Sequence, residues 1–244
     1  MAALPILNTY QSLITTFSDF LTVAIHTILY ERNLYPATTF LSTRKYNLPV
    51  RQNRHPKVCK WIQDAVAAVE GQMIKGAVSR VVVVIYSPQL EVLERFLFDV
   101  SSFPSVPANE IFTPLEREGG DGEGDEVKIS LVDIEEQLRA TIRKLAVCGG
   151  KLGPLPEGCT YTVAVELKDK APPPIGHPQP WVPSEPSLQT GEKGKSGRIG
   201  SDLGGIVTTP IRSVEAGEFL LESWIEEGSA KRRESGSGIS DVQY

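Results

Sequence analysis

The sequence predicts an α+β domain in which three helices pack on one side of a mostly antiparallel sheet. Three observations support this: apolar residues at helical spacing, β-branched runs between those stretches, and strand pairs joined by turns. The chain has 244 residues, of which 41% are hydrophobic and 23% charged. These values suit one globular domain with a sizeable core. We assign residues 1–227 to this domain and residues 228–244 to a disordered polar tail.

The first helix is predicted between residues 12 and 35. Its apolar side chains recur at helical spacing and are widened to most of the circumference by Phe20 and Val23. Pro36 ends it, because the residue before a proline is disfavoured in helical conformation. The stretch is as apolar as a membrane span, but it contains Asp19 and His26, so we expect a buried core helix. We find no targeting signal, which indicates a nuclear or cytosolic protein.

The next elements follow in order. Residues 45–50 are predicted to be extended with a turn, and Pro56 to open a second helix. The apolar face of that helix comprises Val58, Trp61, Ile62, Ala65, Val66 and Val69. Residues 80–86 are a β-branched run typical of a strand buried on both faces, and residues 92–100 are its returning hairpin strand. An acidic, glycine-rich mobile loop is expected at 116–126. A third helix over 129–147 and a strand over 160–167 follow.

The last third of the chain changes in character. Residues 168–205 are rich in Pro, Gly, Ser, Lys and Glu, with Trp181 as the one large aromatic. The prolines favour an extended strap over a floppy linker. Two strands are then predicted, over residues 206–211 and 219–225, paired as a hairpin whose turn uses Gly217 at positive φ. Alternation places one set of side chains toward the core, namely Phe219, Leu221, Ser223 and Ile225, and another outward, namely Leu220, Glu222 and Trp224.

Few residues suggest catalysis or cofactor binding. The net charge of −5 argues against direct nucleic-acid binding. Three cysteines without a CxxC pair argue against zinc and a disulfide framework. The three histidines are scattered: His26 suits a hydrogen-bonded core position, His55 a helix cap and His177 the strap. Phosphate-loop and calcium-loop fragments, near Gly194 and Asp121, are incomplete. We therefore expect no enzyme, cofactor or metal, with a hydrolase or nucleotide enzyme as the alternative.

Two tryptophans suggest a binding role. Trp61 can either pack on the helix face or face a ligand, and both interpretations stay open. Trp181, in a proline-rich polar segment, has to bury against its own core or against a guest peptide.

Several motifs are familiar in sequence and order. They are Phe20-Leu21, Ala24-Ile25-His26, Ile28-Leu29-Tyr30, Tyr35-Pro36, Lys45-Tyr46-Asn47-Leu48-Pro49-Val50, His55-Pro56, Ile62-Gln63-Asp64, Val81-Val82-Val83-Val84-Ile85, Gly158-Cys159-Thr160-Tyr161-Thr162-Val163 and Pro180-Trp181. Over residues 12–227 the chain resembles the HORMA-domain family. Within it, the chain is similar to the mitotic-arrest-deficient-2-like B branch, the accessory subunits of translesion DNA polymerase zeta.

The resemblance implies a HORMA fold with a core over about residues 8–167 and a C-terminal "safety belt" over about 168–227. The belt would close over a short Pro-containing peptide of the polymerase's catalytic subunit. A second surface would meet the C-terminal domain of the deoxycytidyl-transferase scaffold protein. The expected function is a non-catalytic adaptor in DNA damage tolerance, located in the nucleus or also the cytoplasm. The alternative is a HORMA adaptor in mitotic checkpoint or anaphase-promoting-complex control.

The resemblance also implies residue roles. Trp61, Tyr161 and Trp181 would bind the peptide. Arg139 and Lys144 would serve a HORMA homo- or heterodimer. Thr208, Glu222 and Trp224 would face the scaffold, where the family shows Leu, Gln and Tyr, and we expect this contact only when the belt is closed. The belt's resting state, the guest peptide, the oligomeric state and the roles of the acidic loop and the Gly/Lys-rich stretch near Gly194 stay open.

Overall fold

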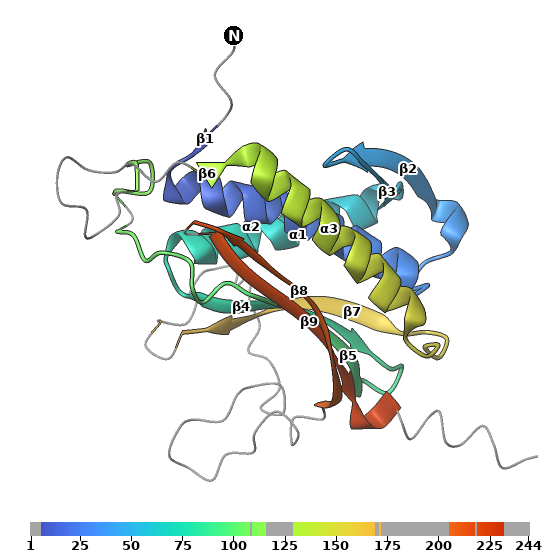
Figure 1. Cartoon of the computed structure of the whole chain (residues 1–244). Helices are drawn as coiled ribbons and strands as arrows, with labels where there is room; N and C mark the ends of the chain where they lie inside the picture. The colour runs from blue at the N-terminus through green and yellow to red at the C-terminus, as the bar shows by residue number, and fades with distance from the viewer. Residues whose placement is uncertain are drawn as a thin grey trace, which may run out of the picture.

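The computed structural model describes residues 6–107, 109–115, 129–168, 171, 205–217 and 219–231. In this part of the chain three long helices lie on one face of a five-stranded antiparallel sheet, so the predicted α+β class is confirmed (Figure 1). The elements are β1 (Ile6–Leu7), α1 (Tyr10–Glu31), the 3-10 turn η1 (Ala37–Thr39), β2 (Phe40–Lys45), β3 (Leu48–Asn53), α2 (Pro56–Ile74), β4 (Val78–Tyr86), β5 (Val92–Asp99), β6 (Ile129–Ser130), α3 (Leu131–Lys151), β7 (Thr160–Leu167), β8 (Gly205–Ala216) and β9 (Phe219–Gly228).

Helix α1 is the core helix that the sequence predicts. It begins with a reciprocal cap, in which the Ser12 N–H donates to Thr9 Oγ1 (3.1 Å) and the Thr9 N–H to Ser12 Oγ (3.2 Å). By length and composition α1 could cross a membrane, but 72% of its most apolar window is buried inside the domain. His26 is also a core residue, and its Nδ1 accepts a hydrogen bond from the Asn53 N–H.

The other two helices begin close to their predicted positions. Helix α2 starts at Pro56, and His55 occupies its N-cap position as expected, although the His55 side chain makes no capping hydrogen bond. Helix α3 starts at Leu131, two residues later than predicted, because Ser130 caps it and accepts from the Asp133 N–H. Residues 129–130 instead form β6, which pairs with β1.

The turn predicted within residues 45–50 belongs to a longer hairpin, β2–β3. Its two turn residues, Tyr46 and Asn47, both have a φ of 52°. Positive φ at both central positions is the backbone of a two-residue hairpin turn whose twist matches that of the strands.

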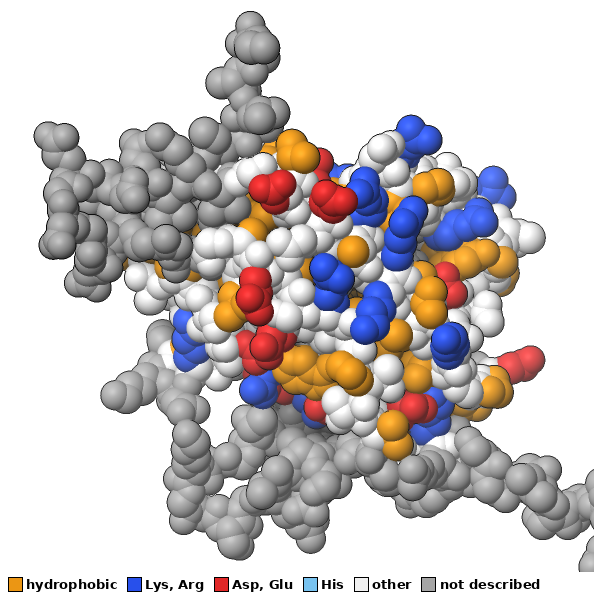
Figure 2. Space-filling model, viewed as in Figure 1, with side chains coloured by type: hydrophobic (Ala, Val, Ile, Leu, Met, Phe, Trp, Pro, Cys, Tyr) orange, Lys and Arg blue, Asp and Glu red, His pale blue; other side chains and the backbone are white. Residues whose placement is uncertain are grey.

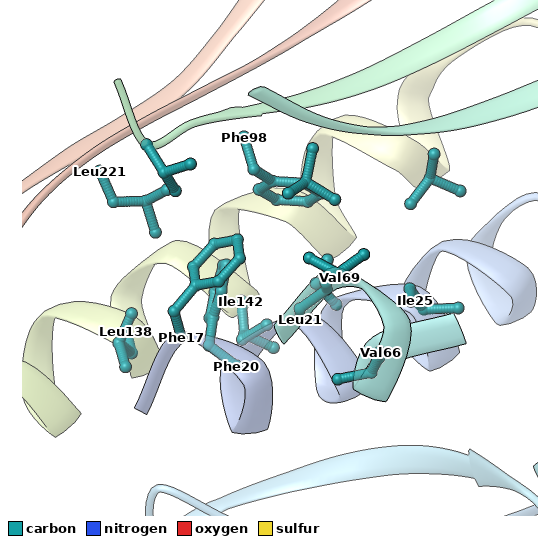
Figure 3. Close-up of a cluster of buried hydrophobic side chains, with 14 of the residues drawn as sticks. Phe17, Phe20, Leu21, Ile25, Val66, Val69, Phe98, Leu138, Ile142 and Leu221 are labelled. Atoms are coloured by element: carbon teal, nitrogen blue, oxygen red, sulfur yellow. The ribbon is translucent and has the colours of Figure 1, made fainter. Parts of the chain in front are cut away.

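The main sheet has the strand order β7-β4-β5-β9-β8. Its helix-facing side chains interdigitate with those of all three helices, and Figure 3 shows the cluster around Phe17, Phe20, Phe98, Ile142 and Leu221. Strand β4 is buried on both faces as predicted, because Val82 and Val84 of its far face pack with Leu97 and Trp224 in a second, smaller cluster.

The C-terminal hairpin β8–β9 forms as predicted, with Gly217 at a φ of 58° in its turn. Phe219, Leu221, Ser223 and Ile225 point to the core and are buried.

The assignment of residues 228–231 to a disordered tail is wrong. Gly228 ends β9, residues 229–231 form a helical turn, and the Lys231 ammonium pairs with Glu94 and Glu227 inside the domain. Residues 232–244 and the predicted acidic loop at 116–126 lie outside the described residues.

Candidate functional site

Strand β7 is an edge of the main sheet. It pairs with β4 along its whole length, and no strand of the described residues pairs with its other side. In an antiparallel ladder about half of an edge strand's backbone N–H and C=O groups point away from its partner. Such an edge is a template for one more extended chain.

An aromatic cluster stands beside this edge. The Trp61 ring on α2 meets Tyr161 at the start of β7 edge to face, with ring centroids 5.0 Å apart and an interplanar angle of 76°. Tyr35, from the segment after α1, meets the same Tyr161 ring at 6.3 Å and 85°. Burial raises the pKa of the Tyr161 hydroxyl above its ordinary value, and the neighbouring Tyr35 adds to the shift. The three rings therefore form one preformed apolar surface.

The side chain of Trp61 is only partly buried in the fold. It is 39% exposed, whereas Ile62 beside it on α2 is fully buried. Of the two interpretations left open by the sequence, the structure supports a Trp61 that packs on one edge and leaves the rest of its ring accessible.

The half-covered apolar surface continues along the strand. Tyr161 and Val165 pack against the helix-side core but are only partly buried, while their partners on β4, Ile85 and Val81, are buried completely. The edge thus combines backbone groups that no other described strand pairs with and accessible apolar side chains, which are the two features by which a sheet edge holds an extended peptide.

The chain leaves the sheet at the end of this same strand. The Lys168 N–H donates to the Ala77 carbonyl (2.9 Å), and the chain re-enters at Gly205 on β8, the opposite edge. The two edges are four strand spacings apart, which is about 19 Å. The strap predicted over residues 168–205 connects them. Trp181, its predicted peptide-binding residue, lies outside the described residues.

The sheet face away from the helices holds the predicted scaffold-facing residues. Cross-strand register places Ala164, Val82, Leu97, Trp224 and Pro210 in one apolar row.

Charged rows flank this apolar row. Arg80 binds Asp99 and Glu166, and Arg95 binds Glu166 and Glu226, at 2.7–3.1 Å. The Arg80 guanidinium lies 5.8 Å from the centre of the Trp224 ring.

Thr208, Glu222 and Trp224 share this outer face, with Thr208 opposite Glu226 and Trp224 opposite Pro210. Thr208 and Glu222 are exposed, while Trp224 packs partly against the sheet. The three predicted residues therefore form one continuous surface, whose contact with a scaffold stays a prediction.

The predicted dimerisation residues lie on α3. Arg139 is half-exposed and binds Glu136 one turn earlier (3.1 Å), and Lys144 is exposed. Both side chains are accessible to a partner, and their role in a dimer stays a prediction.

The described residues hold no group of three or more His, Cys, Asp or Glu side chains that could bind a metal. Cys59, Cys148 and Cys159 form no disulfide with one another. Burial lowers the pKa of the His26 imidazole to about 4, so it is neutral at physiological pH and serves the core.

Sequence reasoning missed Tyr35 as part of the aromatic cluster. Its position directly before Pro36 marks it as extended and outside the helix, but only the long-range pairing of β7 brings Tyr161 to it.

Comparison with known proteins gives a consistent family. Residues 14–196 match the HORMA domain family. A rat relative, "Mitotic spindle assembly checkpoint protein MAD2B", is 35% identical over 68% of this chain and 70% of its own length. The "DNA polymerase zeta processivity subunit" of Schizosaccharomyces pombe is 29% identical over 87% of this chain and 92% of its own.

Solved structures share the fold at low sequence identity. A chain of the mitotic checkpoint complex has a TM-score of 0.62 at 20% identity, covering 88% of this chain and 98% of its own. Caenorhabditis elegans HTP-2 bound to the HIM-3 closure motif has a TM-score of 0.60 at 14% identity, covering 92% of this chain and 93% of its own.

Proposed function

The chain belongs to the HORMA-domain family, and we propose that it is a non-catalytic, peptide-clamping accessory subunit of translesion DNA polymerase zeta. Relatives named as polymerase zeta processivity subunits align with it over most of both chains, which supports the assignment to that complex. The observation that carries the clamp is the open β7 edge with Trp61 and Tyr161 beside it, at the strand from which the strap departs.

The guest in this proposal is a Pro-containing segment of the catalytic subunit. It adds to β7 as an extended strand, and its backbone groups pair with the free ones of β7. A proline fits where its missing N–H would face solvent. The rings of Trp61 and Tyr161 supply an apolar surface for the guest's side chains. Because the strap is anchored at both edges of the sheet, it can enclose a bound segment, with Trp181 as its anchor.

The outer face of β8–β9 serves a second partner in this proposal, the C-terminal domain of the deoxycytidyl-transferase scaffold protein. Thr208, Glu222 and Trp224 form the contact, and hairpin pairing with β5 holds them in place. The chain then bridges two proteins in the nucleus. Arg139 and Lys144 on α3 serve a HORMA–HORMA contact, which Arg139→Ala would shift from dimer to monomer in sedimentation.

The test uses overlapping peptides from the catalytic subunit, titrated into the full chain by calorimetry. One Pro-containing peptide is expected to bind, and Trp181→Ala to weaken it at least tenfold with folding retained, since an aromatic anchor contributes about 2 kcal/mol. Unchanged affinity in this variant would show that Trp181 is not part of the clamp. Trp224→Ala is the matched variant: it is expected to lose the scaffold domain in a pull-down and keep the peptide.

A second candidate keeps the clamp and changes the complex. Relatives of 34–35% identity are named mitotic spindle assembly checkpoint proteins, which favours a role in checkpoint or anaphase-promoting-complex control. The two candidates differ in the protein whose peptide co-purifies with the chain.

A further inference from the structure

The basic residues of this acidic protein are strongly segregated. Residues 32–63 and 137–156 together contain 11 of the chain's 25 Lys and Arg residues and none of its 30 Asp and Glu residues. The first stretch includes the β2–β3 hairpin, and the second covers the C-terminal two thirds of α3. A net charge of −5 for the whole chain hides this separation.

Most of these cations are exposed and without an ionic partner among the described residues. Arg32 is buried, and Lys45, Lys60 and Arg139 are paired with Asp19, Asp64 and Glu136. Seven others are exposed and have no ion pair with a described residue: Arg44, Arg51, Arg54, Lys57, Arg143, Lys144 and Lys151. We call these seven the cationic surface.

The two stretches adjoin in space. Glu31, at the end of α1, lies against Gly149 and Gly150 of α3. Burial raises the pKa of the Glu31 carboxyl, and the charge of Arg51 on β3 is near enough to lower that pKa by a smaller amount. Arg32 donates to the Gly149 carbonyl (2.9 Å), which fixes the end of α3 beside α1. Figure 2 shows Lys and Arg side chains gathered over the part of this face where α3 and the hairpin lie, with few acidic side chains among them.

The size of the surface matches a nucleic-acid backbone. Six residues of β2 span about 20 Å, and the α3 segment from Arg139 to Lys151 about 18 Å. A DNA duplex carries one phosphate charge per ~1.7 Å of axis, so a 20 Å footprint presents about six phosphates on one side. Five of the seven positions lie on or beside these two elements, and arginine is well suited to paired contacts with phosphate oxygens.

We propose that the cationic surface binds the phosphodiester backbone of nucleic acid without sequence preference. This is separate from the β7 edge and does not depend on peptide capture. It replaces the expectation, drawn from net charge, that the chain does not contact nucleic acid directly. About five phosphate contacts predict a strongly salt-dependent affinity, in the micromolar range or weaker at physiological salt.

The test measures fluorescence anisotropy of labelled 20-base-pair duplexes of DNA and of RNA with the full chain, from 50 to 200 mM NaCl. Arg44→Gln/Arg54→Gln removes two charges from the cationic surface. Lys75→Gln/Arg212→Gln removes two exposed charges elsewhere and is the matched control. The surface variant is expected to bind DNA at least tenfold more weakly, and its salt slope to fall by about two, while the control matches the wild type.

Two results would overturn the proposal: equal loss of affinity in both variants, or polyglutamate displacing the duplex at equal charge, which would indicate an acidic protein partner. Comparison of the DNA and RNA titrations shows which nucleic acid binds more tightly. Peptide binding by the same preparations verifies folding, so a failed nucleic-acid titration leaves the clamp untouched.

Discussion

The two edges of the main sheet are built differently. Strand β8 is protected: Pro210 lacks a donor, two register shifts interrupt its pairing, and the Gln137 side chain covers its backbone. That amide donates to the Glu215 carbonyl (2.9 Å) and accepts from the Glu215 N–H (3.1 Å), as a neighbouring strand would. Strand β7 has no proline and no such cover among the described residues, and it has Trp61 beside it instead. Proteins normally block exposed edges, so an edge without a described partner beside an aromatic surface is the feature on which the proposed peptide capture rests.

The largest expected effect comes from breaking the anchor on the protected side. Glu94 on β5 is fully buried and accepts from Arg32 Nε and Nη2 (2.8 Å each), and it also binds Lys231 beyond β9. Glu94→Ala leaves the buried Arg32 without its carboxylate and Lys231 with Glu227 alone, and unpairing a buried cation typically costs about 3–5 kcal/mol. We expect urea denaturation to show a loss of this size. A loss under 1 kcal/mol would mean that the ion cluster does not hold β9 in place.

We expect a lower pH to destabilise the core, and therefore both edges of the sheet that pack on it. The folded-state pKa of His26 is lowered to about 4, below its usual value near 6.5, so the unfolded chain binds a proton first as pH falls. The stability from neutral His26 is full above pH 6.5 and is lost progressively down to pH 4, by about 3 kcal/mol.

His26→Gln keeps an acceptor for the Asn53 N–H but does not titrate. Its unfolding free energy should therefore depend less on pH between 6.5 and 4 than that of the wild type. Equal pH profiles for the two proteins would exclude His26 as the titrating group.

Trp61→Ala is expected to damage the open edge alone. Removal of a half-exposed interface aromatic weakens binding by about 2 kcal/mol, or about thirtyfold, while it costs the fold little. Leu41→Ala is the control, because Leu41 is exposed to a similar degree but lies on the β2–β3 hairpin. Calorimetry with the captured peptide should separate the two variants, and similar affinities would argue against the Trp61 surface.

Gln137→Ala is expected to have the smallest effect, on the protected edge. It removes the two hydrogen bonds to Glu215, which are solvent-exposed, so the loss of stability should be about 1 kcal/mol. With the cover gone, β8 should also self-associate at high concentration, which light scattering would detect. A variant that stays monomeric and keeps full stability would show that Gln137 is not an edge cover.

Local pattern was sufficient for most of the fold. Helical spacing located α1 to α3, a β-branched run located β4, and alternation located β7, because these signals depend on neighbouring residues. The roles of β7 and Lys231 could not be predicted from local pattern. Thr160 to Leu167 alternates in the same way in a central or an edge strand, and only the pairing order shows that one side is open. Lys231 lies in a polar stretch of the sequence, and its partner, Glu94, is 137 residues away.

The candidate site was predicted in part for the same reason. The family resemblance placed Trp61 and Tyr161 in one peptide-binding set, and the fold brings their rings into contact. Tyr35 joins them through contacts that no local spacing encodes.

The most direct measurement is hydrogen–deuterium exchange of the full chain with and without the captured catalytic-subunit peptide. Amides of β7 that face away from β4 have no partner in the described structure and should exchange quickly in the free chain. On peptide binding they should become strongly protected, while β8 amides change little. Protection confined to β8–β9, with β7 unchanged at saturating peptide, would contradict capture at the open edge.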